Sequence, residues 1–268
     1  MSTMTYAVRD STTMVRRNLK HLLRYPSLTV TVIAMPVVFL LLFTYVFGGT
    51  MGAGLPGDLG SASGDPRADY LHYLTPAILV MTVVAVAQST AILIAKDATE
   101  GIIDRFRTLP IARSAPLTGH ALAAMVQTVL GVVVVLAVAL ALGYRSDASV
   151  AGWAGAVGTL LLMGWAVTWL CLALGLASGS VEAASNAPMP LILLPFLSSA
   201  FVPADSMPGP LGWFAEHQPF TPVIETLRAC LDGTGPGSDA WWAVAWCVAI
   251  SAVCFAWAVR AFGRARNG

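Results

Sequence analysis

YLTPAILVMTVVAVAQSTAILIA, residues 73–95, is the stretch of this sequence that decides the fold. It contains no Lys, Arg, Asp or Glu, and it exceeds the roughly 20 residues that a helix needs to cross the hydrocarbon core of a bilayer. Backbone amides in lipid must be hydrogen-bonded within their own segment, so irregular chain is excluded there. The stretch therefore predicts a transmembrane helix.

Five further segments have the same uncharged, apolar character. They are residues 28–47, 117–143, 150–178, 183–202 and 241–259. The composition agrees, since charged residues make up only 11% of the chain and the mean hydropathy is +0.74, whereas soluble domains carry about 25% charged residues. We therefore expect residues 1–268 to form one all-α integral membrane domain with six transmembrane helices.

The distribution of basic residues predicts the orientation. Only three of the 15 Lys and Arg residues, Arg67, Arg145 and Arg228, lie on the side opposite the N-terminus. The positive-inside rule places the Lys- and Arg-rich side in the cytoplasm. We expect a multi-pass protein with both termini cytoplasmic, and the excess of Arg, Ala, Gly and Val is typical of a GC-rich bacterium, which suggests the bacterial plasma membrane.

Several classes of function lack their sequence signals. The four cysteines form no CxxC pair and the four His are scattered, so we expect no metal site and no catalytic residues. No Gly-Lys pair of a phosphate-binding loop occurs, no span holds an acid for ion coupling, and no long basic run predicts nucleic-acid binding. An intramembrane enzyme stays an alternative with little support, because His120 is the one His in a span and no GxSxG occurs.

The N-terminal residues 1–27 contain a basic amphipathic segment. Val8, Val15 and Leu19 share one helical stripe, while Arg9 and Arg16 fall on the other face. Such a helix lies flat at the inner membrane interface. It is either a plain topological anchor or an elbow that moves during a functional cycle.

Residues 97–110 predict a cytoplasmic helix between the second and third spans. Asp97 and Glu100 have the spacing of a capping box, and Pro110 would end the helix. Ile102, Ile103, Phe106 and Leu109 give this helix an apolar face. An exposed helix of this kind either docks in a groove of a partner protein or folds back on its own bundle.

Two segments fall on the opposite side. Residues 48–72 are rich in Gly and Ser and predict a flexible loop. Within residues 203–240, Thr221 is a candidate N-cap with Pro222 at the first helical position, and Gly233 suits the helix end. Glu225 and Arg228, three residues apart, can pair. The residues alone predict an interfacial cap helix.

Some polar and sulfur-containing residues lie inside the spans. Met81, Gln88, Met125 and Gln127 are candidates for a substrate path, although polar residues in spans also serve as interhelical hydrogen-bond partners. Pro188, Pro190 and Pro195 interrupt the fifth span, where they create hinges or packing kinks.

The sequence also resembles a known family at two places. EGIIDRFRTLPIARSAPLTG (100–119) and FVPADSMPGPLGWFAEHQPFTPVIETLRACLDG (201–233) resemble the signature regions of the ABC type-2 transporter permease family. Both occur at the expected places in the six-span order, so the resemblance covers essentially the whole chain. Within the family, the chain is most similar to the daunorubicin-resistance branch of multidrug exporters.

The resemblance implies a fold and partners. It implies an amphipathic elbow helix, a cytoplasmic coupling helix, re-entrant external helices before the last span, and a homodimer working with two copies of a separate ABC ATPase. ATP and Mg²⁺ would bind that partner, and this chain would hold no cofactor. The cargo would be a lipophilic, drug- or antibiotic-like compound moved outward across the membrane; export of a lipid, peptide or glycan, and a non-transporting assembly role, are the alternatives.

The resemblance also implies roles for particular residues. The residues that would couple to the ATPase are Glu100, Gly101, Asp104, Arg105, Phe106, Arg107, Pro110 and Arg113. The residues that would belong to the re-entrant helices are Thr221, Pro222, Glu225, Leu227 and Arg228.

Overall fold

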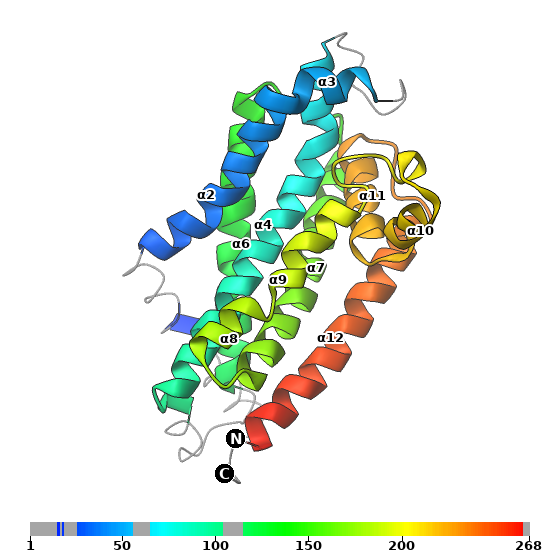
Figure 1. The fold of residues 1–268 in the computed structure, drawn as a ribbon. Coiled ribbons are helices and arrows are strands. Elements are labelled where there is room, and N and C mark those ends of the chain that lie inside the picture. The colour runs from blue at the N-terminus through cyan, green and yellow to red at the C-terminus, as the bar shows by residue number, and fades with distance from the viewer. Residues whose placement is uncertain (1–14, 17, 19–25, 56–64, 104–114, 265–268) are drawn as a thin grey trace.

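The computed structural model describes residues 15, 16, 18, 26–55, 65–103 and 115–264, and the regular structure within these residues is entirely helical. Five helical stretches are long and apolar enough to cross a membrane. They are α2–η1–α3 (Pro26–Leu42, Phe43–Phe47, Gly48–Ala53), α4 (Pro66–Thr99), α6 (Ala115–Ala141), α7 (Val150–Ala177) and α12 (Asp239–Arg264). They form one elongated bundle (Figure 1).

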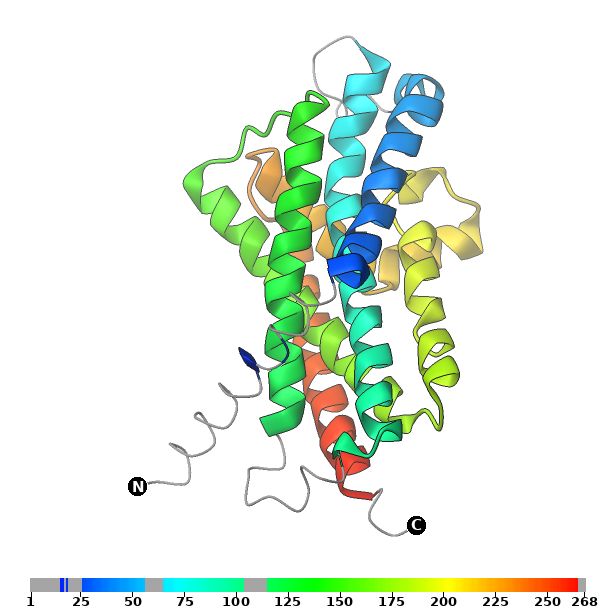
Figure 2. The ribbon, with the colours of Figure 1, turned by 90° about the vertical axis from the view of Figure 1, so that its left-hand side faces the viewer.

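Helix α4 is the centre of this bundle. In its most apolar 18-residue stretch 72% is buried inside the protein, whereas the corresponding share is 22% in the first and last long helices. It packs against α2, α6 and α7, and Figure 2 shows its upper half between α6 and α2. Gly175 of α7 permits a close approach, because a Cβ there would lie 2.5 Å from the carbonyl oxygen of Ala91. The surfaces of the peripheral helices remain available to lipid or to another protein.

The prediction of a loop over residues 48–72 is wrong at both ends, where the chain is helical. The first helix continues through a π-helical turn, Phe43–Phe47, and ends only at Ala53. Helix α4 begins at Pro66, where the Asp65 side chain accepts a hydrogen bond from the Arg67 N–H. Gly residues carry intrinsic helix penalties of about 1 kcal/mol, and here packing against the start of α4 overrides that preference.

The fifth apolar segment is broken into short helices. Helix α8 (Val181–Asn186), α9 (Met189–Leu193) and the 3₁₀ turn η2 (Leu194–Leu197) follow one another, and the chain leaves helical geometry at Ser198. Proline has no N–H to donate, and the prolines predicted to interrupt this segment lie at the junctions between its pieces. The single helix expected over residues 183–202 is therefore not continuous.

A helical cap gathers at the end of the bundle where α12 begins. It consists of the 3₁₀ turn η3 (Ala204–Ser206), α10 (Gly209–His217) and α11 (Phe220–Leu231) (Figure 1). Helix α11 packs against α4, α7 and α12. We call this end the α11 end; at the opposite end α4 terminates and α6 begins.

The cysteines are inside the protein. Cys171, Cys230, Cys247 and Cys254 are all buried and none forms a disulfide. Among the described residues, no three His, Cys, Asp or Glu side chains gather closely enough to hold a metal ion.

Candidate functional site

A cavity of about 170 Å³ lies between α2, α4 and the broken fifth segment. Its walls are almost wholly apolar and include Val32, Met35 and Phe39 of α2. Because Met35 is 58% exposed, the cavity opens sideways from the bundle. Apolar walls with few polar groups suit the apolar part of a small molecule, and the cavity is smaller than the roughly 300 Å³ or more that encloses a whole drug-sized ligand.

Two of the four predicted path residues line this cavity. Met81 and Gln88 contribute to its α4 wall. Gln88 also donates a hydrogen bond from Nε2 to the carbonyl oxygen of Ser185, at 3.3 Å, and so joins α4 to α8. The path and packing interpretations of Gln88 are therefore compatible.

The other two predicted path residues lie elsewhere. Gln127 is buried on α6, and its Nε2 lies 3.5 Å from Thr29 Oγ1 of α2. Met125 lies against α7 at Gly164, where an added Cβ would be 3.4 Å from the Met125 methyl carbon. Neither residue lines the cavity, and both contacts join α6 to a neighbouring helix.

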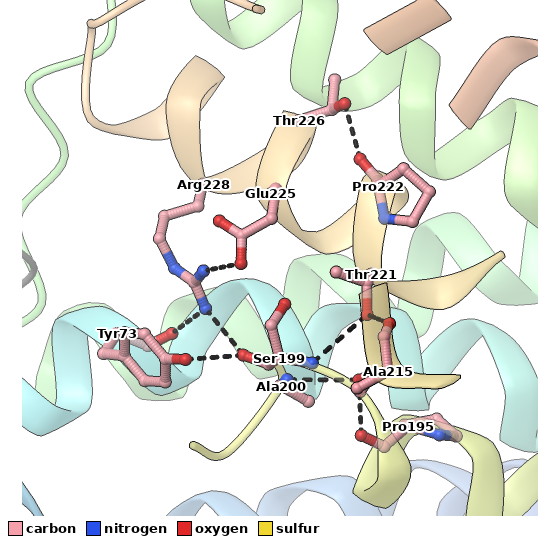
Figure 3. A network of polar contacts seen from close by, with 11 residues as sticks. Tyr73, Pro195, Ser199, Ala200, Ala215, Thr221, Pro222, Glu225, Thr226 and Arg228 are labelled. Carbon is pink, nitrogen blue, oxygen red and sulfur yellow. Dashed lines mark hydrogen bonds and ion pairs between the residues drawn. The ribbon is translucent and has the colours of Figure 1, made fainter. Parts of the chain in front are cut away.

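The α11 end contains a buried cation. Arg228 is 5% exposed and donates from Nη1 to Glu225 Oε1 at 2.6 Å, so the pair predicted from the i, i+3 spacing is present. From Nη2 it also donates to the carbonyl oxygens of Tyr73 and Ser199, each at 3.3 Å (Figure 3). The guanidinium carbon lies 4.0 Å from the centre of the Tyr73 ring, a cation–π contact.

Tyrosine hydroxyls add to this cluster. Tyr73 donates to the Ser199 carbonyl at 2.7 Å, and Tyr70 donates to the Phe201 carbonyl at 3.4 Å. The stretch of chain after η2 is thus bonded by side chains from both α4 and α11. Buried backbone groups outside regular structure need such partners.

The predicted N-cap role of Thr221 is wrong. Helix α11 begins at Phe220, with Pro219 at the N-cap position. The Thr221 hydroxyl accepts from the Ser199 N–H at 3.3 Å and donates to the Ala215 carbonyl oxygen, so its hydrogen bonds go to the irregular stretch after η2 and to α10 rather than to its own helix. Pro222 and Leu227 are buried in α11, and Gly233, with φ of +73° just beyond the helix, has the conformation expected of a helix-ending glycine.

The prediction that a separate helix starts at Asp97 is also wrong. Asp97 belongs to the last turn of α4, which continues to Thr99 with Glu100 at its C-cap. Gly101, with φ of +71°, then ends the helix in the left-handed conformation. Glu100 is exposed and lies 3.8 Å from Lys96 as an ion pair. The other residues predicted to contact the ATPase lie outside the described residues; they are Asp104, Arg105, Phe106, Arg107, Pro110 and Arg113. Most of residues 1–27, where the elbow helix is predicted, also lie outside them.

A buried contact between a His and an Asp at this end was not predicted from the sequence. His120 Nε2 of α6 lies 3.2 Å from Asp97 Oδ2 of α4, with side chains only 8% and 15% exposed. Beside it, Ile103 is buried in an apolar cluster with Leu117 of α6 and Phe262 of α12. The two chain ends that flank the predicted coupling segment are therefore fixed to each other. The sequence shows His120 as the one His in a predicted span, but nothing in it indicates the partner, Asp97, 23 residues away.

A second contact between a His and an Asp lies at the α11 end. His72 Nε2 is 3.6 Å from Asp232 Oδ1, next to the C-terminus of α11. Burial raises the pKa of Asp232, while the neighbouring His72 and Arg228 act to lower it. The burial effect dominates, so this carboxyl is a weaker acid than an exposed Asp.

Comparison with known proteins decides the family. The family model described as "ABC-2 type transporter" matches residues 10–231. The chain belongs to the ABC-2 type transporter family. This confirms the family resemblance found in the two signature stretches.

The curated relatives are resistance proteins of bacteria. The chain is 31% identical over 231 residues to the daunorubicin resistance ABC transporter permease protein DrrB1 of Streptomyces coeruleorubidus, an alignment covering 83% of this chain and 77% of the relative. It is 22% identical over 222 residues to the probable doxorubicin resistance ABC transporter permease protein DrrC of Mycobacterium tuberculosis, covering 83% of this chain and 76% of that one.

These similarities establish the class of the protein. This ABC-2 permease is a multi-pass membrane protein and a transport component rather than an enzyme. Its family implies an ABC ATPase as a separate partner. The cavity, the Arg228 cluster and the Asp97–His120 contact are thus features of a transport subunit.

Proposed function

We propose that this permease exports lipophilic, drug-like compounds across the bacterial plasma membrane, driven by ATP hydrolysis in a partner subunit. The observation that carries the proposal is the similarity to a daunorubicin resistance permease over 83% of this chain. The apolar, laterally open cavity supports it, because a compound dissolved in the inner leaflet could enter there without crossing a polar surface.

The proposed topology has six spans. The pieces α8, α9 and η2 form an apolar stretch, Val181–Leu197, that would provide the fifth crossing in addition to the five long helices. An even number of crossings places both termini on one side, which the Lys and Arg distribution assigns to the cytoplasm. The α11 end is then external, with α10 and α11 as its re-entrant helices and residues 1–27 as the elbow.

The proposed assembly is a homodimer with two ATPase subunits, which bind ATP and Mg²⁺. The exposed faces of α2 and α12 leave room for a second copy of the permease as well as for lipid. ATPase contact would use Glu100, Gly101 and the segment that follows, extending to Arg113. The Asp97–His120 pair would transmit movement of that segment to both α4 and α6.

Reconstitution with the partner ATPase tests the coupling role. In inside-out vesicles, the triple variant Glu100→Ala, Arg105→Ala, Arg107→Ala should lose most ATP-dependent daunorubicin uptake, measured by fluorescence. Lys96→Ala is the matched control, because it removes an exposed charge from the turn before the segment. Full uptake and ATPase activity in the triple variant would reject the proposed coupling surface.

Two glutamines within the bundle test the cavity. Gln88→Leu should change the apparent KM for daunorubicin, because Gln88 lines the cavity. Gln127→Leu removes the same amide from α6, outside the cavity, and should leave that KM unchanged. Equal effects of the two substitutions would argue that the cavity does not bind the transported compound.

A further inference from the structure

Four phenylalanine rings meet at one end of the cavity. Phe39, which lines the cavity, lies 6.0 Å from Phe196 in an edge-on arrangement. Phe196 stacks on Phe201 with ring centres 4.7 Å apart and planes 8° apart, and Phe201 lies 4.6 Å from Phe43. We call these four residues the phenylalanine cluster. It joins the first helix to the end of the fifth segment.

The cluster lies between the cavity and the α11 end. Phe39 and Pro195 are cavity-lining residues, Phe43 is one turn further along the first helix towards α3, and Phe196 directly follows Pro195. Phe201 is only 7% exposed and closes the cluster on the side of Tyr70 and Tyr73. A compound leaving the cavity towards this end would have to separate these rings.

The fifth-segment half of the cluster is held by side-chain hydrogen bonds. Between Phe196 and Phe201 the backbone is no longer helical after Leu197. Its groups are bonded instead by Arg228 and Tyr73 at the Ser199 carbonyl and by Thr221 at the Ser199 N–H (Figure 3). Tyr70 donates to the Phe201 carbonyl. These contacts fix where Phe201 stands relative to α4.

The first-helix half of the cluster, Phe39 and Phe43, is held by ring contacts rather than by side-chain hydrogen bonds. Phe43 also begins the π-helical turn Phe43–Phe47, and such turns occur mostly within α-helices and frequently at functional sites. The cluster therefore brings a side that is hydrogen-bonded to α4 and α11 against a side that is held by apolar packing. Apolar contacts can separate without leaving buried polar groups unpaired.

We propose that the phenylalanine cluster is the outer gate of the cavity and that Arg228 is the positioning residue for its fixed side. The inference rests on the proposed export function. A guanidinium buried with one carboxylate is costly to desolvate, and here it also bonds the two backbone carbonyls of Tyr73 and Ser199. The gate opens when the first helix moves away from Phe201, while Arg228 keeps Ser199 in place.

Transport by the reconstituted permease–ATPase complex tests the gate. Phe196→Ala with Phe201→Ala should keep ATP hydrolysis but lower the daunorubicin exported per ATP by about tenfold, a change equivalent to about 1.4 kcal/mol, because the compound can return through a gate that no longer closes. Phe255→Ala is the control, because this α12 ring packs on Trp169, away from the cluster. Unchanged export per ATP in the double variant, or an equal loss in Phe255→Ala, would overturn the gate.

Hydrogen–deuterium exchange tests the role of Arg228 without requiring transport. In Arg228→Gln, peptides covering residues 196–203 should exchange about tenfold faster while α12 peptides stay unchanged, because local opening is set by these hydrogen bonds. Arg228→Lys, which keeps the charge beside Glu225, should restore part of the protection. If Arg228→Gln does not fold, Tyr73→Phe removes only the hydroxyl bond to Ser199 and should show the same local change.

The two readouts separate two kinds of failure. Absence of ATP-dependent daunorubicin export by the wild-type complex would refute the proposed function and, with it, the gate. Wild-type export with normal exchange at residues 196–203 in both Arg228→Gln and Tyr73→Phe would refute only the positioning role.

Discussion

At the α11 end, Arg228, Tyr73 and Thr221 bond a stretch of irregular chain, whereas at the opposite end one buried side-chain contact, Asp97 with His120, joins two regular helices. The difference follows from the backbone at each end. After Leu197 the chain is no longer helical, so its buried polar groups need side-chain partners. Helices α4 and α6 satisfy their own backbones, so a single pair and apolar packing suffice there.

This comparison predicts that stability depends most on Arg228. Arg228→Met leaves Glu225 without its partner and removes a donor from two carbonyls, so it should cost about 3 kcal/mol. The apparent melting temperature of the protein in detergent measures the loss. Arg145→Met is the control, since Arg145 also donates to two carbonyls but is exposed. Equal losses would contradict the importance of burial.

The Asp97–His120 pair should give the next largest effect. A double-mutant cycle with Asp97→Asn and His120→Gln should show a coupling energy of about 1.5 kcal/mol, because the pair is largely buried. Thermal unfolding of the four proteins provides the measurement. Additive losses would mean that the two side chains do not stabilise each other, and the two ends of the coupling segment would then be joined by apolar packing alone.

Tyr73 and Tyr70 offer a finer comparison within the α11 end. Tyr73→Phe should cost about 1 kcal/mol, the typical net worth of one hydrogen bond. Tyr70→Phe should cost less, because its hydroxyl lies 3.4 Å from its acceptor, against 2.7 Å for Tyr73. Melting curves recorded in the same detergent compare the two. A larger loss for Tyr70 would show that the longer contact is the stronger one.

The exposed pair at the end of α4 should have the smallest effect. Lys96 and Glu100 are about half exposed at 3.8 Å, so Lys96→Ala should change stability by about 0.3 kcal/mol. Its melting temperature should lie within error of the wild type. A loss as large as that of Asp97→Asn would remove the distinction between buried and exposed pairs at this end.

Local features of the sequence predicted much of the fold. Uncharged length predicted each long helix, because crossing a membrane is a property of one segment alone. The Glu225–Arg228 pair and the helix-ending Gly233 depend on spacings within one helix, and both are present. The positions of the prolines predicted where the fifth segment would be interrupted, but not how completely its helix would break.

Contacts between distant segments could not be predicted in this way. The capping-box spacing at Asp97 was outweighed by the continuing hydrogen bonds of α4 and by the contact with His120. The same is true of Thr221, whose hydroxyl bonds chain six and 22 residues away rather than its own helix. The phenylalanine cluster depends on how the first helix packs against the fifth segment, which no single-segment pattern encodes.

The burial of all four cysteines has a practical consequence. Thiol reagents attack the exposed thiolate, and the native thiols are shielded by packing. One cysteine introduced at Thr50, which is exposed near the end of the first helix, would therefore be the preferred target for a maleimide spin label or fluorophore, without first removing the natural cysteines. Movement of this end of the first helix could then be followed spectroscopically in an otherwise native permease.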